Sequence, residues 1–206
     1  MIFAYIVGAA VLGAFLVLFY AAWRIGVVSR GTKIGARDKT ALLLVDLQTV
    51  FWDSGPYDEA AKSAAQEVIL DEIKAAKAQG LPVVAVRQEW SLPSSKLLAR
   101  LFMKGQAIEG SAGTEIAAPF AGLADHVVVK RVQDAFDTGE LDRLLAELNV
   151  GRLRILGLDF NYCVHKTALA ARNRGYAVTV LKGGSLAAGA TARAEQRMAD
   201  SGAILQ

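Results

Sequence analysis

The sequence predicts an α/β protein of three layers (α/β/α), in which helices cover both faces of a mostly parallel six-stranded sheet with Rossmann-like topology. Two observations carry this prediction. Six short apolar runs recur along the chain, and helical patterns lie between most of them. Three of the helical stretches end directly before a glycine, which is typical of a helix C-terminus. Because strand–helix–strand units have right-handed crossovers, this alternation makes consecutive strands parallel.

The expected strands are too short to be helices and are almost wholly apolar, as in a buried parallel sheet. They cover 41–46, 82–86, 126–130, 153–157, 177–181 and 203–205. The expected helices cover 58–79, 140–148, 164–174 and 191–201. The segment 87–125 is longer than one simple helical connection, and such an excursion is typical of a lid or a partner contact.

The N-terminal part differs in composition from the rest. No charged residue occurs between Ile2 and Trp23, and roughly 22 residues of helix span about 33 Å, enough to cross a bilayer core of about 30 Å. We therefore predict a transmembrane helix over 1–23, a basic juxtamembrane linker over 24–39 and a folded domain over 40–206. A cleaved signal peptide is the alternative, but the start of the run lacks a basic residue.

Charge patterning predicts which side of the membrane the domain occupies. Basic residues follow the apolar run and none precedes it, which predicts a single-pass membrane protein with a cytoplasmic domain. The chain has 23 basic and 20 acidic side chains. Five of the basic and one of the acidic side chains lie in 24–39, which leaves 18 basic and 19 acidic side chains in 40–206. The pI of about 9.0 is thus a property of the linker and suits anionic lipid headgroups rather than nucleic acid. A single cysteine cannot form an internal disulfide, which agrees with a reducing compartment.

Three chemically active side chains follow three different predicted strands. Asp46 ends the first run, Lys130 ends the third, and Cys163 lies in the turn after the fourth. The carboxyl ends of parallel strands meet at one edge of a sheet, so a carboxylate, an ammonium and a thiol are expected to share one crevice.

Four stretches around these residues match a known pattern in order and spacing. They are Asp46–Phe51 against D-x-Q-x-x-F, Gly113–Glu115 against P-G-T-E, Lys130–Leu141 against K-x-x-x-S-A-F-x-x-T-x-L, and Gly157–Tyr176 against G-x-x-T-D-x-C-V-x-x-T-A followed by G-Y. On these motifs residues 40–206 resemble the isochorismatase-like cysteine hydrolases, a superfamily that includes nicotinamidases and amidohydrolases of small carbamoyl compounds. The chain departs from the pattern with Ala112 for proline, Phe160-Asn161 for Thr-Asp, and Lys182-Gly183-Gly184 where Asp-Ala is frequent.

The resemblance implies an isochorismatase-like hydrolase fold and an enzyme that cleaves a C–N bond of a small amide, ureido or carbamoyl compound through a thioester. It implies that Cys163 is the nucleophile, that Asp46 transfers the proton and that Lys130 holds both. It also implies an oxyanion hole made of the backbone amides of Asp159 and Cys163, beside a cis peptide between Leu158 and Asp159. A cation and a helix N-terminus are expected to lower the pKa of the thiol from about 8.5 toward 7 or below.

The walls of the substrate pocket are expected from side chains close to these strand ends. The predicted lining is Gln48, Phe51, Trp52, Gln88, Phe160 and Asn161, and Arg87, Glu89 and Trp90 are further candidates. The Phe160-Asn161 pair leaves every proposed catalytic atom in place, but it changes the pocket, so the substrate of a named relative does not transfer.

Cys163 and His165 also admit other interpretations. Cys163 could be a buried structural thiol, and a redox sensor would lack a resolving cysteine in this chain. His165 lies two residues further along a predicted helix and points about 200° away from Cys163, which argues against a Cys–His dyad and predicts a helix-surface or partner-contact residue.

The sequence also bears on cofactors and partners. Nicotinamidase-like members bind metal through an Asp and several histidines after the first strand, whereas this chain has only His126 and His165, elsewhere, so we predict no metal. No glycine-rich loop follows the first strand, so no dinucleotide and no other cofactor is expected. Superfamily members often self-associate, which suggests a homo-oligomer. A membrane-tethered scaffold that keeps the fold without catalysis is the competing hypothesis.

Overall fold

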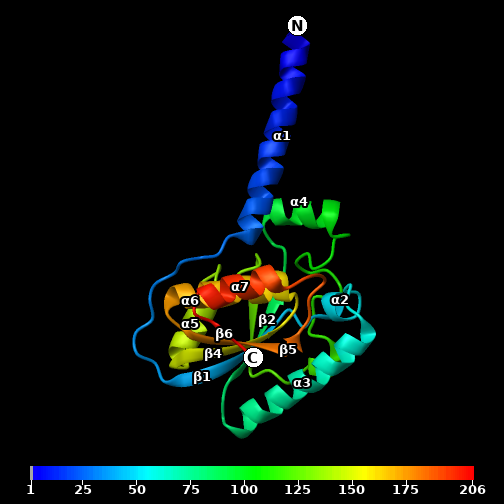
Figure 1. Cartoon of the computed structure of the whole chain (residues 1–206). Coiled ribbons are helices and arrows are strands. Elements are labelled where there is room, and N and C mark those ends of the chain that lie inside the picture. Colours follow the sequence, from blue (N-terminus) through cyan, green and yellow to red (C-terminus); the bar gives the residue numbers. More distant parts are fainter. Residues whose placement is uncertain (1) are drawn as a thin grey trace.

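A single six-stranded sheet forms the centre of the protein (Figure 1). The computed structural model describes residues 2–206, except the side chains of residues 2–4, 6, 7, 9–11 and 14. The strand order is β3-β2-β1-β4-β5-β6, and every neighbouring pair is parallel. The strands are β1 (Lys39–Val45), β2 (Val83–Gln88), β3 (His126–Lys130), β4 (Val150–Gly157), β5 (Ala177–Ser185) and β6 (Ile204–Leu205).

Helices cover both faces of this sheet. The helices are α1 (Ile2–Gly26), α2 (Thr49–Trp52), α3 (Glu59–Ala78), α4 (Pro93–Phe102), α5 (Glu140–Glu147), α6 (His165–Arg174) and α7 (Ala192–Asp200), with a 3-10 turn η1 (Ala118–Phe120) and a π-helical turn η2 (Phe160–Val164). Helix α3 packs with η1 on one face, and α5, α6 and α7 pack on the other. The predicted three-layer α/β/α architecture with a parallel sheet of six strands is confirmed.

The alternation of side chains along β1 shows why its run is continuously apolar. Leu43 and Val45 point into the core under α5 and α6, while Leu42 and Leu44 point into the core over α3. A strand covered on both faces needs apolar residues at consecutive positions, which is the pattern that predicted it.

The predicted transmembrane helix over 1–23 falls on α1, part of whose side chains lie outside the described residues. In the part of the chain that the structure describes, no helix has the length and the apolar character that crossing a bilayer requires. The predicted anchor, and the single-pass topology that depended on it, are therefore not supported.

The segment between α1 and β1, predicted as a linker, is fixed along the domain. The backbone N–H of Ser29 donates to Asp134 at 2.7 Å, and the N–H of Ile34 donates to the carbonyl of Arg174 at 2.8 Å. Gly31 has a φ of +60°, and a Cβ there would lie 2.3 Å from the Arg174 guanidinium carbon. The segment is thus a strap whose path requires glycine at its closest approach.

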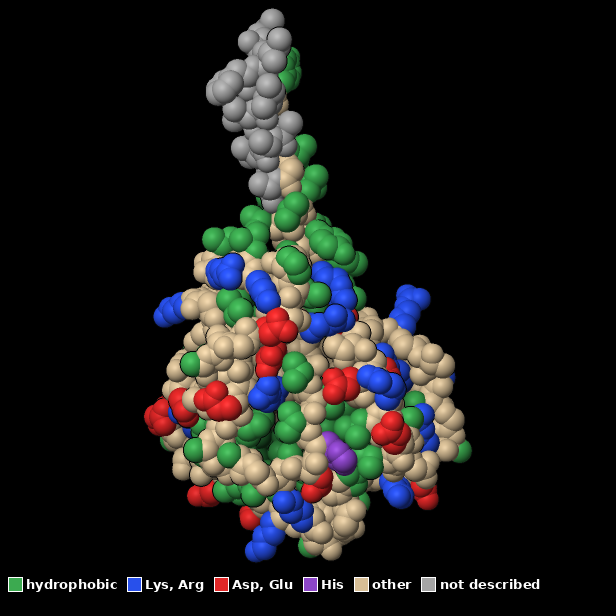
Figure 2. Space-filling model, turned by 180° about the vertical axis from the view of Figure 1, so that it is seen from behind, with side chains coloured by type: hydrophobic (Ala, Val, Ile, Leu, Met, Phe, Trp, Pro, Cys, Tyr) green, Lys and Arg blue, Asp and Glu red, His purple; other side chains and the backbone are tan. Residues whose placement is uncertain are grey.

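The long connection after β2 contains α4, which contacts the C-terminal part of α1. Ile25 of α1 packs with Trp90, Ala99 and Met103 in a small apolar cluster. Hydrophobic side chains gather around the base of α1 (Figure 2). Large exposed apolar side chains on these two helices include Phe15, Phe19, Tyr20, Trp23, Leu101 and Phe102.

Candidate active site

The three residues singled out by sequence meet at the carboxyl edge of the sheet. Asp46 directly follows β1, Lys130 is the last residue of β3, and Cys163 lies in η2 after β4. The Lys130 Nζ atom is 2.9 Å from Asp46 Oδ2 and 3.2 Å from Cys163 Sγ. All three are buried, and the Lys130 side chain is fully inaccessible to solvent.

Asp46 reaches this position through an unusual backbone conformation. Its φ is +53°, in the left-handed region that non-glycine residues rarely adopt. Such a conformation costs about 1–3 kcal/mol and persists only where surrounding contacts hold it. Here the N–H of Asp46 donates to the carbonyl of Val86 at 2.8 Å, and its own carbonyl accepts the N–H of Gln48 at 2.8 Å.

Two buried glutamines hold the lysine in place. Gln88 Nε2 donates to the carbonyl of Lys130 at 3.3 Å, and Lys130 Nζ donates to Gln88 Oε1. Behind it, Gln48 Oε1 accepts the N–H of Gln88 at 2.6 Å, while Gln48 Nε2 donates to the carbonyls of Gln88 at 3.1 Å and Thr114 at 2.8 Å. Buried amides paired this completely form a rigid support.

Burial sets the protonation of the resting site. Desolvation raises the pKa of the Cys163 thiol far above its ordinary value; the Asp46 charge raises it further, and Lys130 opposes this only in part. Desolvation also raises the pKa of Asp46, against the effect of Lys130. Burial alone would lower the pKa of Lys130, but the Asp46 carboxylate, together with the Cys163 sulfur that lies within hydrogen-bonding distance of the ammonium, outweighs burial and raises that pKa. The expectation of a lowered thiol pKa was therefore wrong, because the sulfur lies in a desolvated site beside a carboxylate.

The turn from β4 to Cys163 is built around Gly157. This glycine has a φ of +128°, and a Cβ there would lie 2.0 Å from the carbonyl oxygen of Val45. Leu158 N–H donates to that same carbonyl at 2.8 Å. The cis peptide expected between Leu158 and Asp159 is not present, since the described residues contain no cis peptide bond. Glycine makes the sharp change of direction instead.

Asp159 fixes the loop around the thiol with its side chain. Its carboxylate accepts the N–H groups of Asn161 and Ala188, both at 2.7 Å, and the hydroxyl of Tyr57 at 3.4 Å. Desolvation raises the pKa of Asp159 despite these donors. In the described part of the chain, its backbone N–H makes no hydrogen bond and so remains available to a ligand.

A cavity of about 120 Å³ opens beside Cys163. Its lining is Asp46, Phe51, Tyr57, Gln88, Trp90, Met103, Gln133, Leu158, Asp159, Tyr162 and Cys163. Of the predicted walls, Phe51, Gln88 and Trp90 line it. Sequence reasoning missed Tyr57, Met103 and Gln133, which lie on loops with no recognisable pattern, and also Tyr162, whose place next to Cys163 was a usable signal.

The other predicted pocket residues lie elsewhere. Gln48 is buried behind Gln88, where its hydrogen bonds are internal. Trp52 packs edge-on against Phe120 at a centroid distance of 4.8 Å, and Phe160 belongs to the core beneath α6. Asn161 lines a neighbouring cavity rather than this one. Residues adjacent in sequence point to different sides of a helical turn, which explains these errors.

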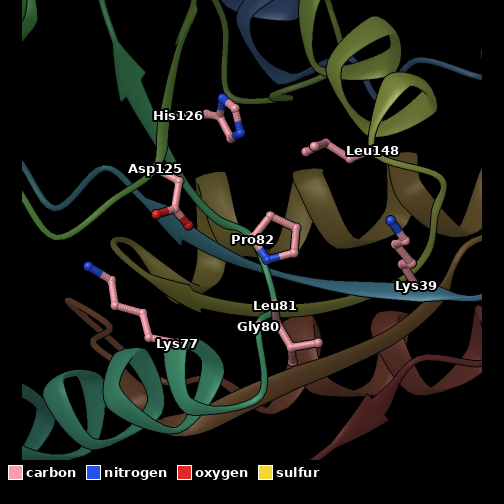
Figure 3. A pocket seen from close by; sticks show the side chains of 8 residues that line it. All are labelled: Lys39, Lys77, Gly80, Leu81, Pro82, Asp125, His126 and Leu148. Carbon is pink, nitrogen blue, oxygen red and sulfur yellow. The ribbon is translucent and has the colours of Figure 1, made fainter.

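The two histidines lie in different parts of the fold and do not form a joint metal site. His126 begins β3 at the opposite edge of the sheet, in a cavity of about 430 Å³ whose lining also includes Lys39, Lys77 and Asp125 (Figure 3). His165 is buried at the start of α6, so it is not the helix-surface residue that its sequence position predicted. Among the described residues no three His, Cys, Asp or Glu side chains are grouped as metal ligands. The residues present therefore do not fit a metal, and the absence of a metal cofactor stays a prediction.

Comparisons with known proteins agree with this geometry. The family model described as Isochorismatase domain matches residues 40–205. A search of curated proteins finds no match.

Solved structures with a similar fold include proteins from three organisms. An isochorismatase family protein from Desulfovibrio vulgaris is 25% identical, with a TM-score of 0.68 over 82% of this chain and 94% of that one. An N-carbamoylsarcosine amidase from Thermoplasma acidophilum is 24% identical, with a TM-score of 0.69 over 82% of this chain and 96% of that one. A pyrazinamidase of Pyrococcus horikoshii in complex with zinc is 22% identical, with a TM-score of 0.68 over 82% of this chain and 99% of that one.

Proposed function

The chain belongs to the isochorismatase family, and on that premise we propose that it is a cysteine hydrolase that cleaves a C–N bond of a small amide, ureido or carbamoyl compound. One observation carries the proposal most directly. A single buried ammonium, that of Lys130, contacts both a carboxylate and the only thiol of the chain, at 2.9 and 3.2 Å. A nucleophile, a base and a charge that orients both are the parts that acyl transfer needs.

The raised pKa values define the resting state of the proposed reaction. Cys163 holds its proton, Asp46 is paired with Lys130, and Lys130 is charged. Because burial raises the pKa of Asp46 as well, this carboxylate is a stronger base than an exposed aspartate. When a substrate carbonyl carbon approaches, Asp46 takes the thiol proton and the sulfur attacks.

The remaining steps follow from conservation of atoms and charge. The carbonyl oxygen gains the electron pair of its broken π bond, and the N–H groups of Asp159 and Cys163 would stabilise this oxyanion. Asp46 then gives its proton to the leaving nitrogen, the C–N bond breaks, and an acyl-thioester remains on Cys163. Water attacks the thioester with Asp46 as base, which releases the acid and restores the thiol.

The substrate class is drawn from the size and walls of the cavity. About 120 Å³ beside Cys163 admits only a small acyl group, and Phe51, Trp90 and Tyr162 give it aromatic walls. A compact or planar amide or carbamoyl group fits such walls best. The amidase names of two structures with similar folds support the same choice.

The test combines turnover with detection of the intermediate. The full-length protein is incubated with a heteroaromatic amide, an aliphatic amide and an N-carbamoyl amino acid, and ammonia release is measured. Intact-mass spectrometry of a rapidly acid-quenched sample then looks for one acyl adduct. Since the chain has one cysteine, an adduct that is absent from Cys163→Ala is assigned to that sulfur without further mapping.

Matched variants separate the proposed roles from general damage. Asp46→Asn and Cys163→Ala should each lower kcat/KM by about 10³-fold or more, whereas Lys77→Met, an exposed lysine at the opposite edge of the sheet, should not change it. Turnover by Cys163→Ala would overturn the mechanism. Absence of both turnover and adduct across the amide classes would favour the non-catalytic scaffold.

A further inference from the structure

A second cavity adjoins the proposed catalytic one and has a different chemistry. It has a volume of about 490 Å³ and lies between the end of α1, the start of α6 and helix α7. Its charged and titratable lining includes His165, Lys166, Arg193 and Arg197. Gln133 and Tyr162 also line the cavity at Cys163, so the two share a wall.

The charged side chains of this cavity all have the same sign. Lys166 comes from α6, and Arg193 and Arg197 lie one turn apart on α7. No acidic residue lines the cavity, and within the described part of the chain none of the three cations takes part in an ion pair. Glu195, which lies between the two arginines in the sequence of α7, pairs instead with Lys182 at 2.9 Å.

The cations are close enough to affect one another. Burial lowers the pKa of Lys166, and the charges of Arg197 and Arg193 lower it further. Like charges held together without a counter-ion cost free energy, which a bound anion would recover. Two guanidinium groups and an ammonium are also the side chains that proteins use most for phosphate, because the guanidinium fork matches two phosphate oxygens.

His165 supplies a second, independent observation. Its side chain is 4% exposed, its Nδ1 lies 3.3 Å from the carbonyl oxygen of Asn161, and its Nε2 is buried without a partner. Burial, and then the charges of Lys166 and Arg197, lower its pKa to about 4. His165 thus lines the same cavity as the cations and is kept neutral first by burial and then by the positive charge that a bound anion would cancel.

We propose that this cavity binds the phosphate group of a small anionic ligand through Lys166, Arg193 and Arg197. The shared wall at Gln133 and Tyr162 brings such a ligand next to the thiol without occupying its cavity. The proposal does not depend on hydrolase activity, since it concerns binding alone.

Inorganic phosphate is the probe, and the two histidines of the chain are the reporters. Full-length protein is titrated with phosphate at pH 7 and constant ionic strength, with chloride in the parallel series, while the imidazole resonances are followed by NMR. His165 should shift saturably with phosphate and not with chloride. His126, at the opposite edge of the sheet, is an internal control and should not move.

Variants of exposed residues complete the test without endangering the fold. Arg193→Gln and Arg197→Gln should each weaken phosphate binding about tenfold, and Arg143→Gln, an exposed arginine of α5, should leave it unchanged. Phosphate that binds the double variant Arg193→Gln/Arg197→Gln as tightly as the wild type, or shifts both histidines equally, would overturn the proposal. Thermal unfolding of each variant verifies that the fold is retained.

Discussion

Replacing Lys130 with methionine removes the ammonium while it keeps a chain of similar length. The Lys130–Asp46 pair has an N–O distance of 2.9 Å and side-chain exposures of 0% and 3%. At an effective dielectric constant of about 20, two unit charges at that distance attract by roughly 6 kcal/mol. Desolvation of both ions offsets much of this attraction, so the intact pair adds little net stability, but an orphaned buried partner costs about 3–5 kcal/mol. We expect Lys130→Met to lower the free energy of unfolding by that amount.

A double-mutant cycle isolates the pair from other effects of the substitutions. Asp46→Asn should also destabilise, because it leaves the ammonium buried without its counter-ion, whereas Asp46→Asn/Lys130→Met removes both charges. The double variant should therefore lose about 3 kcal/mol less than the sum of the two single losses. Urea denaturation at pH 7 measures each free energy. Lys96→Met is the matched control: Lys96 and Glu109 are also 2.9 Å apart, but they are 31% and 53% exposed, and such pairs contribute about 0.2–1 kcal/mol.

The unfolding free energy that Lys130→Met loses relative to the wild type should depend on pH, and the sign of this dependence can be stated. Burial already raises the pKa of Asp46 in the folded wild type, and removal of the ammonium raises it further. A carboxyl with a raised folded pKa favours the folded state fully below its unfolded value of about 3.9, and this contribution is lost as pH rises through the folded pKa. The decrease in the free energy of unfolding caused by Lys130→Met should thus be smaller at pH 5 than at pH 8. Additive free energies with no pH dependence would refute the buried ion pair.

Three further predictions test other parts of the site. Because burial raises the pKa of Cys163, iodoacetamide should label it more slowly than a free cysteine at pH 7 and about tenfold faster per pH unit above that; fast, pH-independent labelling below pH 8 would indicate a resting thiolate. Gly157→Ala, which would place a Cβ 2.0 Å from a carbonyl oxygen of β1, should cost about 3 kcal/mol or more in urea denaturation, whereas Gly189→Ala, with open space around it, should cost little, and equal costs would contradict the tight turn. Gln48→Leu should cost roughly 3 kcal/mol because it leaves the buried backbone groups of Gln88 unpaired, and an unchanged urea midpoint would show that this support is unnecessary.

The sheet could be predicted because its signal is local and redundant. In a strand covered on both faces every residue is apolar, as Leu42 to Val45 illustrate, so the pattern survives without knowledge of its neighbours. The meeting of Asp46, Lys130 and Cys163 followed from topology, because each lies at the end of a strand of one parallel sheet or in the turn that follows it, and such ends share an edge.

Protonation could not be predicted in the same way. A cation near a thiol suggested a lowered pKa, but the outcome depends on how completely water is excluded, and this is a property of the packed tertiary structure. Cys163 is only 9% exposed, so desolvation outweighs Lys130. The same reason makes iodoacetamide reactivity at low pH a poor test of catalysis, since an active thiol that is protonated at rest would also react slowly.

The turn and the pocket walls needed three-dimensional information of another kind. The choice between a cis peptide and a glycine with positive φ depends on the approach of β1 to Gly157. Tyr57 and Met103 reach the cavity from loops whose paths no periodicity describes. The strap was predicted only as a basic juxtamembrane linker, because its contacts with the domain, such as Ser29 to Asp134, pair residues more than 100 positions apart.

The Lys130 ammonium has fewer N–H donors than there are hydrogen-bond acceptors around it. An ammonium carries three N–H bonds, yet its nitrogen lies within hydrogen-bonding distance of four acceptors: Asp46 Oδ2, Gln88 Oε1, the Val132 carbonyl and Cys163 Sγ. In the resting state the thiol is the weakest of the four acceptors, so it is the one expected to receive no N–H hydrogen bond from the ammonium. In the proposed reaction the sulfur becomes an anion and then competes best for an N–H bond, so a rotation of the ammonium about its Cε–Nζ bond would favour Cys163 Sγ over the Val132 carbonyl. The ammonium nitrogen therefore already lies within reach of the sulfur before any charge forms on it, so the proposed rearrangement can begin with a turn of its N–H bonds.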